Sequence, residues 1–355
     1  MRKVALVLIF SIVLVVGGAV LAGTILWTRI TYQYKGYEAS TQLVEIPKGA
    51  GAAEIRRRLV DAGIVENDLT MRAALIWSRQ ANNLKAGHYQ FERPLSALEV
   101  IDLLVRGEIH TVRITFPEGL SLPEMAVIFE KRGFGTASDW LDAARDPSLI
   151  RDLDPMATDL EGYLFPETYT VAPSTPASEL VAEMVQRFRN NFPEALQQRA
   201  IADGFTVRQV VALAALVEKE TARPDERPLV AAVYRNRLRI GMPMQADPTV
   251  IYALQRAGRY NGNLRRVDLA FDSPYNTYKY PGLPPGPIAA PGKAAIDATL
   301  APADVKHLYF VSRNDGSHVF ADTLAEHNRN VHEYQVLYFQ RQRQRQRQSE
   351  AEGTK

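Results

Sequence analysis

The apolar positions at the start of the chain form one continuous run rather than a periodic pattern. Val4 to Trp27 is a stretch of 24 residues without a charge, which as a helix is long enough to cross the roughly 30 Å hydrocarbon core of a bilayer. Arg2 and Lys3 precede it, so the positive-inside rule places the N-terminus in the cytoplasm and the rest outside. A cleaved signal peptide normally has a shorter apolar part, about 7 to 15 residues. We therefore expect a retained single-pass anchor over residues 1–30.

Beyond the anchor, one pattern of apolar and polar positions occurs twice. The first copy has Val44 and Ile46, then a Pro-x-Gly turn, then an amphipathic run that ends at Gly63. Adding 70 to each number gives the second copy without a gap, beginning at Ile114 and Phe116. Alternation predicts a short strand, and the helical period after the turn predicts a helix. The two copies therefore predict an internal repeat of strand, turn and helix.

Between the two copies, residues 86–91 alternate like a strand, and Leu98 to Arg106 reads as a helix stopped by Gly107. The resulting arrangement of strands and helices over residues 40–110 resembles a LysM module, a small fold that binds glycans containing N-acetylglucosamine. A generic α+β unit that only holds the rest of the chain away from the membrane is an equal alternative. Residues 111–155 then form a second repeat-like α+β unit.

From residue 156 to 338 we expect a larger mixed α+β domain, in which turn-rich segments alternate with helices. The predicted helices are Glu179 to Asn191 with Ser178 as N-cap, Pro193 to Asp203, Val207 to Thr221, Arg227 to Ile240, and about Leu324 to Phe339. Asn314-Asp315-Gly316 lies between two apolar runs and predicts a hairpin. The fold class is therefore α+β, behind one transmembrane helix.

The end of the chain, residues 339–355, has a composition unlike the rest. Arginines at 341, 343, 345 and 347 alternate with glutamines, a pattern typical of a disordered, solvated tail. A weak contact with a membrane surface or a partner is the alternative for this segment.

Composition excludes several classes of function. The net charge of +2 gives no electrostatic case for binding nucleic acid, and the absence of cysteine excludes disulfides, thiolate metal sites and a cysteine nucleophile. The six histidines show no metal-binding spacing such as HExxH, and no GxSxG, Walker A or GxGxxG motif stands out. We therefore expect no metal and no cofactor.

One predicted helix has a composition that points to acid–base chemistry. Residues 210–217 are all apolar, so this helix should be buried on every side. The apolar run leads directly into Glu218, Lys219 and Glu220. A carboxyl group at the end of a buried helix is partly removed from water, which favours the neutral form of such a group. A neutral carboxyl can donate a proton to a leaving glycosidic oxygen.

Spacing alone gives only a weak preference between the two glutamates. Glu218 and Glu220 lie about 200° apart around a helix, so they cannot serve one site together. Glu218 continues a stripe of small residues that includes Ala214, and small neighbours leave room for a ligand. In the alternative reading, both glutamates are solvated helix-end residues or ion-pair partners of Arg223 and Arg227.

Several loops around this helix have compositions that suit sugar recognition. They are rich in Tyr, Asn, Gln, Asp, Pro and Gly, and they cover residues 161–169, 241–250, 273–278 and 282–288. Tyrosine rings stack on the apolar faces of sugars, while the polar side chains can bond to hydroxyl and acetamide groups. Sites commonly lie on loops held by a rigid scaffold, although any one of these segments alone is more often a structural turn.

Taken together, these motifs resemble the endolytic murein transglycosylase family, whose members are also described as YceG-like. The resemblance rests on the segments Glu161 to Tyr169, Leu216 to Thr221, Val233 to Leu238, Gly241 to Val250, Ser273 to Tyr278, Gly282 to Ile288 and Asp315 to Phe320. It extends from the anchor to about Tyr338, and the order of the motifs is highly specific.

The resemblance implies a lyase that cleaves bonds between N-acetylmuramic acid and N-acetylglucosamine within peptidoglycan strands and leaves 1,6-anhydromuramic ends. It places the catalytic carboxyl at Glu218 and implies a role in ending the elongation of new strands. It also implies an inner-membrane protein with its catalytic domain in the periplasm, and peptidoglycan synthases as candidate partners. The candidates for positioning the substrate are Gln245, Asp247, Tyr275, Asn276 and Tyr278. A muramidase that uses water and a non-catalytic glycan-binding scaffold are the alternative functions.

Overall fold

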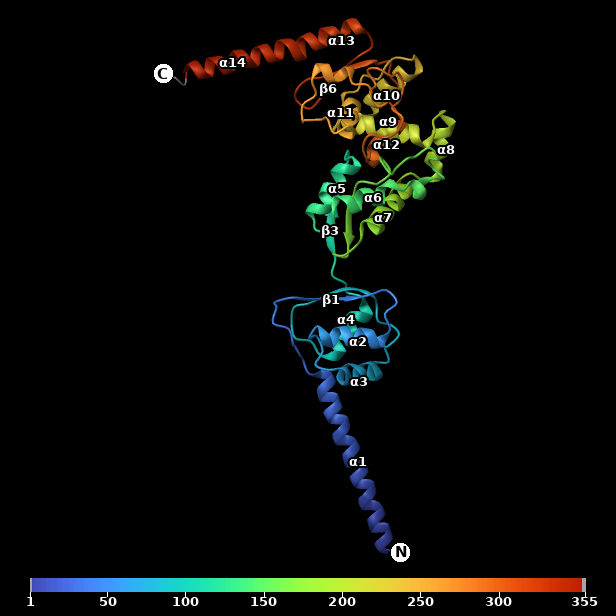
Figure 1. The fold of residues 1–355 in the computed structure, drawn as a ribbon, viewed down its shortest axis with the longest axis vertical. Coiled ribbons are helices and arrows are strands. Elements are labelled where there is room, and N and C mark those ends of the chain that lie inside the picture. Colours follow the sequence, from blue (N-terminus) through green and yellow to red (C-terminus); the bar gives the residue numbers. More distant parts are fainter. Residues whose placement is uncertain (1, 353–355) are drawn as a thin grey trace. The chain divides into compact units, whose positions relative to one another are not determined.

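The structure is a computed structural model that describes residues 2–352, with side chains described from residue 9 to 346 (Figure 1). Arg2, Lys3 and Arg347, on which parts of the sequence predictions rest, therefore lie outside the described side chains. The chain forms two compact units. Unit 1 contains the residues up to Arg113 together with Thr170–Ser174, and unit 2 contains Ile114–Tyr169 and the residues from Thr175 onward.

Unit 1 contains the N-terminal helix and a small α+β core. Its elements are α1 (Arg2–Thr31), β1 (Gln42–Ile46), α2 (Ala52–Asp61), α3 (Asp68–Ser78), β2 (Gly87–Phe91) and α4 (Ala97–Arg106). Strands β1 and β2 pair antiparallel, with Val44 opposite Tyr89. Both residues lie in a buried cluster with Ile55, Leu75 and residues of α4. The predicted strand, helix, second strand and second helix are therefore present, and α3 is a helix that the residue pattern did not predict.

Helix α1 is the one described helix that is long and apolar enough to cross a membrane by itself, over Ile9–Thr31. The described side chains of its apolar span are exposed, unlike those of the core helices. Its C-terminal end joins the fold, because Ile30 is fully buried in the core of unit 1.

Unit 2 contains most of the helices. These are α5 (Leu122–Lys131), α6 (Ala137–Arg145), α7 (Ala177–Asn191), α8 (Glu194–Ala202), α9 (Val207–Glu220), α10 (Arg227–Arg239), α11 (Asp247–Arg256), α12 (Lys293–Leu300), α13 (Leu324–Val331) and α14 (Tyr338–Glu352). Short 3₁₀ turns lie at Pro147–Ile150 and Arg266–Ala270, and a π-helical segment lies at His332–Leu337. Strands β5 (Tyr309–Ser312) and β6 (His318–Ala321) form the predicted hairpin.

Strands β3 (Val112–Thr115) and β4 (Thr168–Val171) form a third two-stranded sheet, and the division between the units falls within both of them. The second repeat copy is β3 followed by α5, as predicted. In both copies the turn after the strand has a glycine with positive φ, 84° at Gly49 and 76° at Gly119. Only glycine adopts this conformation readily, which explains the matching glycines.

The sequence prediction separated residues 111–155 from 156–338, whereas the structure places residues 114–155 in one unit with all of the following segment except Thr170–Ser174. An aromatic cluster explains why they do not separate. Trp140 stacks on Phe116, with ring centroids 5.0 Å apart, and Phe116 meets the edge of Tyr169 at 6.3 Å. All three side chains are essentially inaccessible to water, so the two segments share one hydrophobic core.

Two local predictions also differ from the structure. Helix α7 begins at Ala177 with Pro176 as its N-cap, so Ser178 lies in the first turn instead of capping it. The tail predicted as disordered is helical as far as Glu352. Glutamine and arginine are good helix formers, and most of the side chains described in this helix are exposed. Its helical state therefore reflects local preference rather than burial.

Candidate active site

Helix α9 carries Glu218 at its C-terminal end and is enclosed by the rest of unit 2. The helix starts with a capping box, in which Thr206 and Gln209 satisfy each other's backbone N–H groups. From Val210 to Val217 every residue is buried. The prediction of a helix buried on all sides is therefore confirmed, and the burial fixes the position of the carboxyl group that follows.

The Glu218 carboxyl contacts the start of α10, nine residues further along the chain, and the distant segment just before α12. Its side chain is only 6% exposed. One carboxylate oxygen accepts the N–H of Gly292 at 3.0 Å, and the other lies 3.3 Å from Nη2 of Arg227. The ion pair with Arg227 expected in the alternative reading is therefore present. Arg223 pairs instead with Asp225 and lies 3.7 Å from Glu226.

A second carboxyl group, which the sequence analysis missed, approaches the same guanidinium. Oε2 of Glu118 lies 3.6 Å from Nη2 of Arg227. Burial, followed by the negative charge of Glu218, raises the pKa of Glu118, while the charge of Arg227 opposes this shift. A signal was available in the repeat, because the first copy has Lys48 where the second copy has Glu118. The two copies differ in charge at the one turn position that meets Arg227.

The loop that carries Glu118 is fixed against α9 and against the segment before α12. Nζ of Lys219 donates to the carbonyl of Gly119 at 3.1 Å. The backbone of Gly119 donates to Ala290 at 2.8 Å, and Ala290 donates back to Leu120 at 2.8 Å. Three segments therefore hold Glu118, Glu218 and Arg227 in a common arrangement.

Glu220, the other glutamate of the motif, faces a separate cluster. It accepts the hydroxyl of Tyr234 at 2.8 Å, and burial raises its pKa. The nearby charges that act on it belong to Asp247, His318 and Arg237. The predicted separation of the two glutamates is confirmed, and Glu220 is a buried partner of α10.

Three of the predicted positioning residues lie near this second cluster. Gln245 is exposed and has a positive φ of 51°, an uncommon conformation for a residue other than glycine. Its N–H reaches the carbonyl of Thr277 at 3.3 Å. The hydroxyl of Tyr278 donates to Asp247 at 2.5 Å. Burial, together with that bond, raises the pKa of Tyr278.

The remaining two predicted residues have different environments. Asn276 is fully buried, and its amide donates to the carbonyls of Leu269 and Phe271. It therefore holds its loop together and has no donor left to offer a sugar, which departs from the sequence prediction. Tyr275 is half-buried, with its ring 5.0 Å from that of Tyr252.

Tyr252 leads to a cavity of about 420 Å³ beneath the N-terminal turn of α5. Leu122, Val127 and Leu141 provide apolar walls, and Glu161 and Tyr252 provide polar groups. Glu161 is buried and accepts the N–H of Leu122 and the hydroxyl of Tyr252, each at 3.2 Å. Burial raises the pKa of Glu161 to about 8, so this carboxyl is mostly protonated at neutral pH.

Arg256 completes the polar side of this region. Its guanidinium lies 5.8 Å from the ring centre of Tyr252 and 5.4 Å from that of Tyr275. The loop motifs around residues 161 and 275 are therefore close together, as expected of one binding region.

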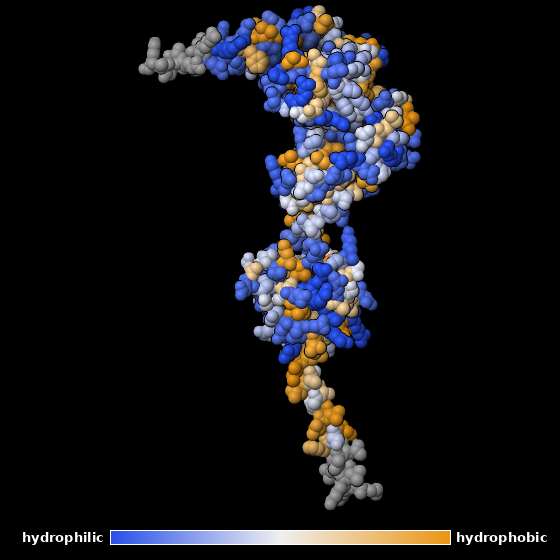
Figure 2. Space-filling view, viewed as in Figure 1, coloured by the Kyte–Doolittle hydropathy of each residue, from blue (hydrophilic) through white to orange (hydrophobic). Residues whose placement is uncertain are grey.

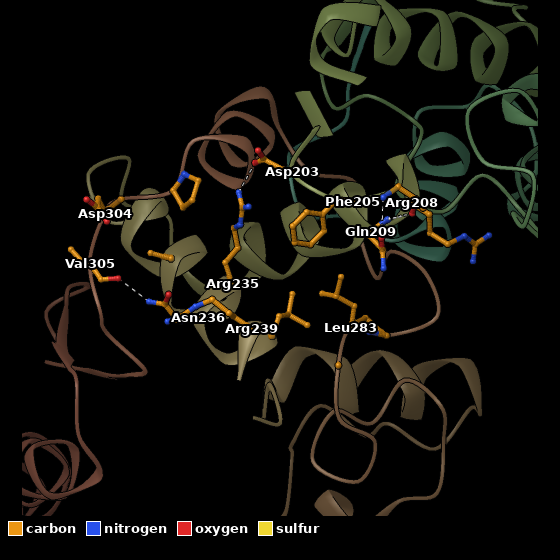
Figure 3. A pocket seen from close by; sticks show the side chains of 18 of the residues that line it. Asp203, Phe205, Arg208, Gln209, Arg235, Asn236, Arg239, Leu283, Asp304 and Val305 are labelled. Carbon is orange, nitrogen blue, oxygen red and sulfur yellow. Dashed lines mark hydrogen bonds and ion pairs between the residues drawn. The ribbon is translucent and has the colours of Figure 1, made fainter. Parts of the chain in front are cut away.

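A larger cavity of about 1010 Å³ lies at the opposite end of α9 (Figure 3). Figure 3 shows Arg235 bonded to Asp203, and Asn236 bonded to the backbone of Val305. Gln209 lines this cavity, and a helix rise of 1.5 Å per residue places it about 14 Å along the axis from Glu218. The acidic residues in its walls are Asp203, which is bonded to Arg235, and Asp304. Among the described residues, no group of three or more His, Asp or Glu side chains could hold a metal ion.

Comparison with known proteins adds an independent observation. Residues 44–333 match the model of the YceG-like family. The chain is 30% identical to an endolytic murein transglycosylase of Bacillus subtilis, covering 90% of this chain and 91% of that one. It is 32% identical to a protein of the same name from Streptococcus pneumoniae, with 82% of this chain and 58% of that one covered. A crystal structure of a YceG-like protein from Listeria monocytogenes superposes with a TM-score of 0.56 at 30% identity, covering 82% and 98% of the two chains.

The raised pKa of Glu161 makes a prediction about stability. The folded state binds this proton more tightly than the unfolded state, whose carboxyl has an ordinary value near 4.5. The stabilisation is therefore complete below about pH 4.5 and is lost as the pH rises towards 8. Between these pH values the free energy of unfolding of the wild type should fall by on the order of a few kcal/mol through this group, and Glu161→Gln should not show that fall. Urea unfolding at several pH values measures the free energy of unfolding of both proteins. The same pH dependence in the wild type and in Glu161→Gln would contradict the prediction.

Proposed function

The chain belongs to the YceG-like family, and we propose that it is an endolytic lytic transglycosylase of peptidoglycan. In this proposal it cleaves the bond between N-acetylmuramic acid and N-acetylglucosamine inside a glycan strand and leaves a 1,6-anhydromuramic end. The observation that carries the proposal is the sheltered carboxyl of Glu218, held by Arg227 and by the Gly292 N–H. The names of the relatives from Bacillus subtilis and Streptococcus pneumoniae support the same reaction.

The simplest mechanism requires one carboxyl group. Glu218 protonates the leaving glycosidic oxygen as the bond to the anomeric carbon breaks. The same group then takes the proton of the C6 hydroxyl, whose oxygen closes the anhydro ring on that carbon. No water is consumed, so the second carboxylate that ordinary glycosidases need is not required. The two contacts to Arg227 and Gly292 fix the orientation of the carboxyl before substrate arrives.

Among the candidates for positioning the substrate, Tyr275 has the most suitable surroundings. Its ring forms a half-buried surface with Tyr252 and Arg256, next to a cavity that contains the protonated Glu161. Gln245, Asp247 and Tyr278 remain proposals for a more distant part of a bound strand. Asn276 is assigned to the support of its loop, because its amide is already bonded.

The location of the protein is part of the proposal. We place α1 across the inner membrane with its N-terminus in the cytoplasm, and the rest of unit 1 and all of unit 2 in the periplasm, where the substrate lies. The supporting observation is the exposed apolar span Ile9–Thr31. Residues 40–110 are proposed as a LysM-like glycan-binding module on the order of their elements. A role in ending the elongation of new strands, with peptidoglycan synthases as partners, completes the proposal.

Replacing the catalytic carboxyl should abolish the reaction without unfolding the protein. We expect Glu218→Gln to lower the formation of anhydro ends on purified uncrosslinked strands by at least about 100-fold, the usual contribution of a general acid or base. Mass spectrometry of the products is the measurement, with Glu183→Gln on the exposed surface of α7 as the matched control.

The same experiment separates the alternatives. A muramidase would leave reducing ends one water heavier than anhydro ends. A scaffold would bind sacculi but release and shorten no strands at any protein concentration. Unchanged turnover in Glu218→Gln would remove this residue from the mechanism.

A second prediction concerns the aromatic surface. Tyr275→Ala should raise KM for glycan strands about fivefold with a smaller effect on kcat, because a stacking contact of roughly 1 kcal/mol is lost. Tyr275→Phe retains the ring and should behave like the wild type. Steady-state kinetics measure both parameters, and a KM unchanged by the alanine substitution would exclude stacking at this position.

A further inference from the structure

Two carboxyl groups share one guanidinium at the proposed active site, although the simplest mechanism uses only one of them. Nη2 of Arg227 lies 3.3 Å from Glu218 and 3.6 Å from Glu118. The two differ in their access to a substrate, since the side chain of Glu218 is 6% exposed and that of Glu118 is 46% exposed. Glu118 is therefore the carboxyl that an entering strand can reach more easily.

The position of Glu118 depends on a glycine across the site. A Cβ atom built on Gly292 would lie 1.8 Å from Oε1 of Glu118, which is far closer than atoms can approach. The φ of Gly292 is −75°, a value that any residue adopts, so a side chain at this position would act by displacing the Glu118 carboxyl and not by straining the backbone. The N–H of the same Gly292 binds Glu218, so one residue positions both carboxyls.

The charges around the Glu118 and Glu218 carboxyls favour a state in which only one of the two is ionised. The charged groups that act on Glu118 are Glu218 from α9 and Arg227 from α10. Two neighbouring carboxylates do not both ionise easily. Glu218 receives the backbone N–H and the nearer guanidinium contact, both of which suit a carboxylate. Burial and the charge of Glu218 raise the pKa of Glu118, which favours a proton on Glu118 over one on Glu218.

We propose that Glu118 is a second acid–base group of this site, which divides the work with Glu218. Glu118 gives its proton to the leaving glycosidic oxygen as the bond to the anomeric carbon breaks. The C6 oxygen bonds to that carbon, and the Glu218 carboxylate accepts the hydroxyl proton. One proton then returns from Glu218 to Glu118 through solvent, so no water is consumed. This inference rests on the proposed lytic transglycosylase reaction.

The test compares two leaving groups. One substrate is a natural glycan strand, and the other is a glycan fragment whose terminal muramic residue carries a 4-nitrophenyl group, which leaves without a proton. Glu118→Gln should lower kcat about 100-fold or more on natural strands and return to within about tenfold of wild type on the aryl substrate. Glu218→Gln should remain inactive on both, because the base is still missing, and Glu183→Gln is the control.

Two results would overturn the division of work. In one, Glu118→Gln retains kcat within threefold of wild type on natural strands. In the other, the aryl substrate restores Glu218→Gln and not Glu118→Gln. If the wild type itself forms no anhydro ends, the proposed function fails first and this inference fails with it. Gly292→Ala gives an independent check: it should lower kcat in the wild type and add little in Glu118→Ala, where the clashing side chain is absent.

A different observation concerns unit 1, where α3 has two apolar faces. Met71, Ala74 and Leu75 face the core and are buried. On the other side, Leu69 is 76% exposed and Ile76 is 70% exposed. Trp77, adjacent to Ile76, is 61% exposed. Positions i, i+7 and i+8 share one face of a helix, so this outward face is apolar over two turns.

This face is continuous with the proposed membrane span. The rings of Trp27 on α1 and Trp77 on α3 lie 5.2 Å apart. Figure 2 shows the apolar surface of α1 running into that of unit 1. Tryptophan is enriched at the boundary between lipid and water, and an apolar helix face parallel to that boundary is typical of interfacial helices.

We infer that the exposed face of α3 lies in the outer interfacial layer of the bilayer, beside the point where α1 emerges. This contact would limit the motion of unit 1 relative to the membrane. It rests on the proposed anchor and is independent of the reaction at Glu218.

Spin labels on the full-length protein can test this contact, because the chain contains no native cysteine. Ile76→Cys is labelled in vesicles of phosphatidylethanolamine and phosphatidylglycerol. Glu45→Cys on β1, which lies away from α1 in Figure 1, is the matched control. The quantity compared is the ratio of collisions with oxygen, which enters the bilayer, to collisions with a water-soluble nickel chelate. We expect this ratio to be at least about threefold higher for the label at 76 than for the control label at 45. Equal ratios at the two positions, or shielding of position 76 from both reagents by a protein partner, would overturn the inference.

Discussion

The arrangement of the proposed site depends on the guanidinium of Arg227. Removing a charge from water is expensive unless opposite charges or hydrogen bonds compensate for it. Arg227 is about 10% exposed, with Glu218 at 3.3 Å and Glu118 at 3.6 Å. Each carboxyl therefore lowers the cost of burying the cation, and the cation brings two acidic groups close together. A carboxyl whose pKa is raised, beside a second carboxyl held by a cation and an N–H group, is an arrangement that suits acid–base chemistry on a glycosidic bond.

The surrounding structure keeps this arrangement in place by local means. The capping box at Thr206 and the burial of every residue from Val210 to Val217 fix α9 along its length. The loop around Gly119 is bonded both to Lys219 and to Ala290. Segments more than 70 residues apart in the chain are therefore joined by the side chain of Lys219 and by direct backbone hydrogen bonds. Fixed positions suit a reaction in which the site gives one proton to the glycosidic oxygen and accepts another from the nearby C6 hydroxyl.

Much of the fold could be predicted from local patterns, because these patterns reflect short-range physics. The apolar span of α1, the repeat of strand, turn and helix, and the buried α9 all follow from the periodicity of apolar residues. Local patterns carry less information where contacts with other segments or within a folded loop decide the structure. Residues 111–155 join the following domain through the Phe116, Trp140 and Tyr169 cluster, and no local pattern shows that contact. Asn276 has the composition of a sugar ligand, but its amide is bonded within its own loop.

The sequence by itself determined that a carboxyl would end a buried helix, because hydrophobic burial depends on composition and helical period. It also determined that Glu218 and Glu220 would point apart, because the geometry of a helix is fixed. Only the tertiary structure decided which charges would surround Glu218. Glu118, Arg227 and Gly292 come from three other segments, and electrostatic interactions depend on distances in space that residue spacing does not specify.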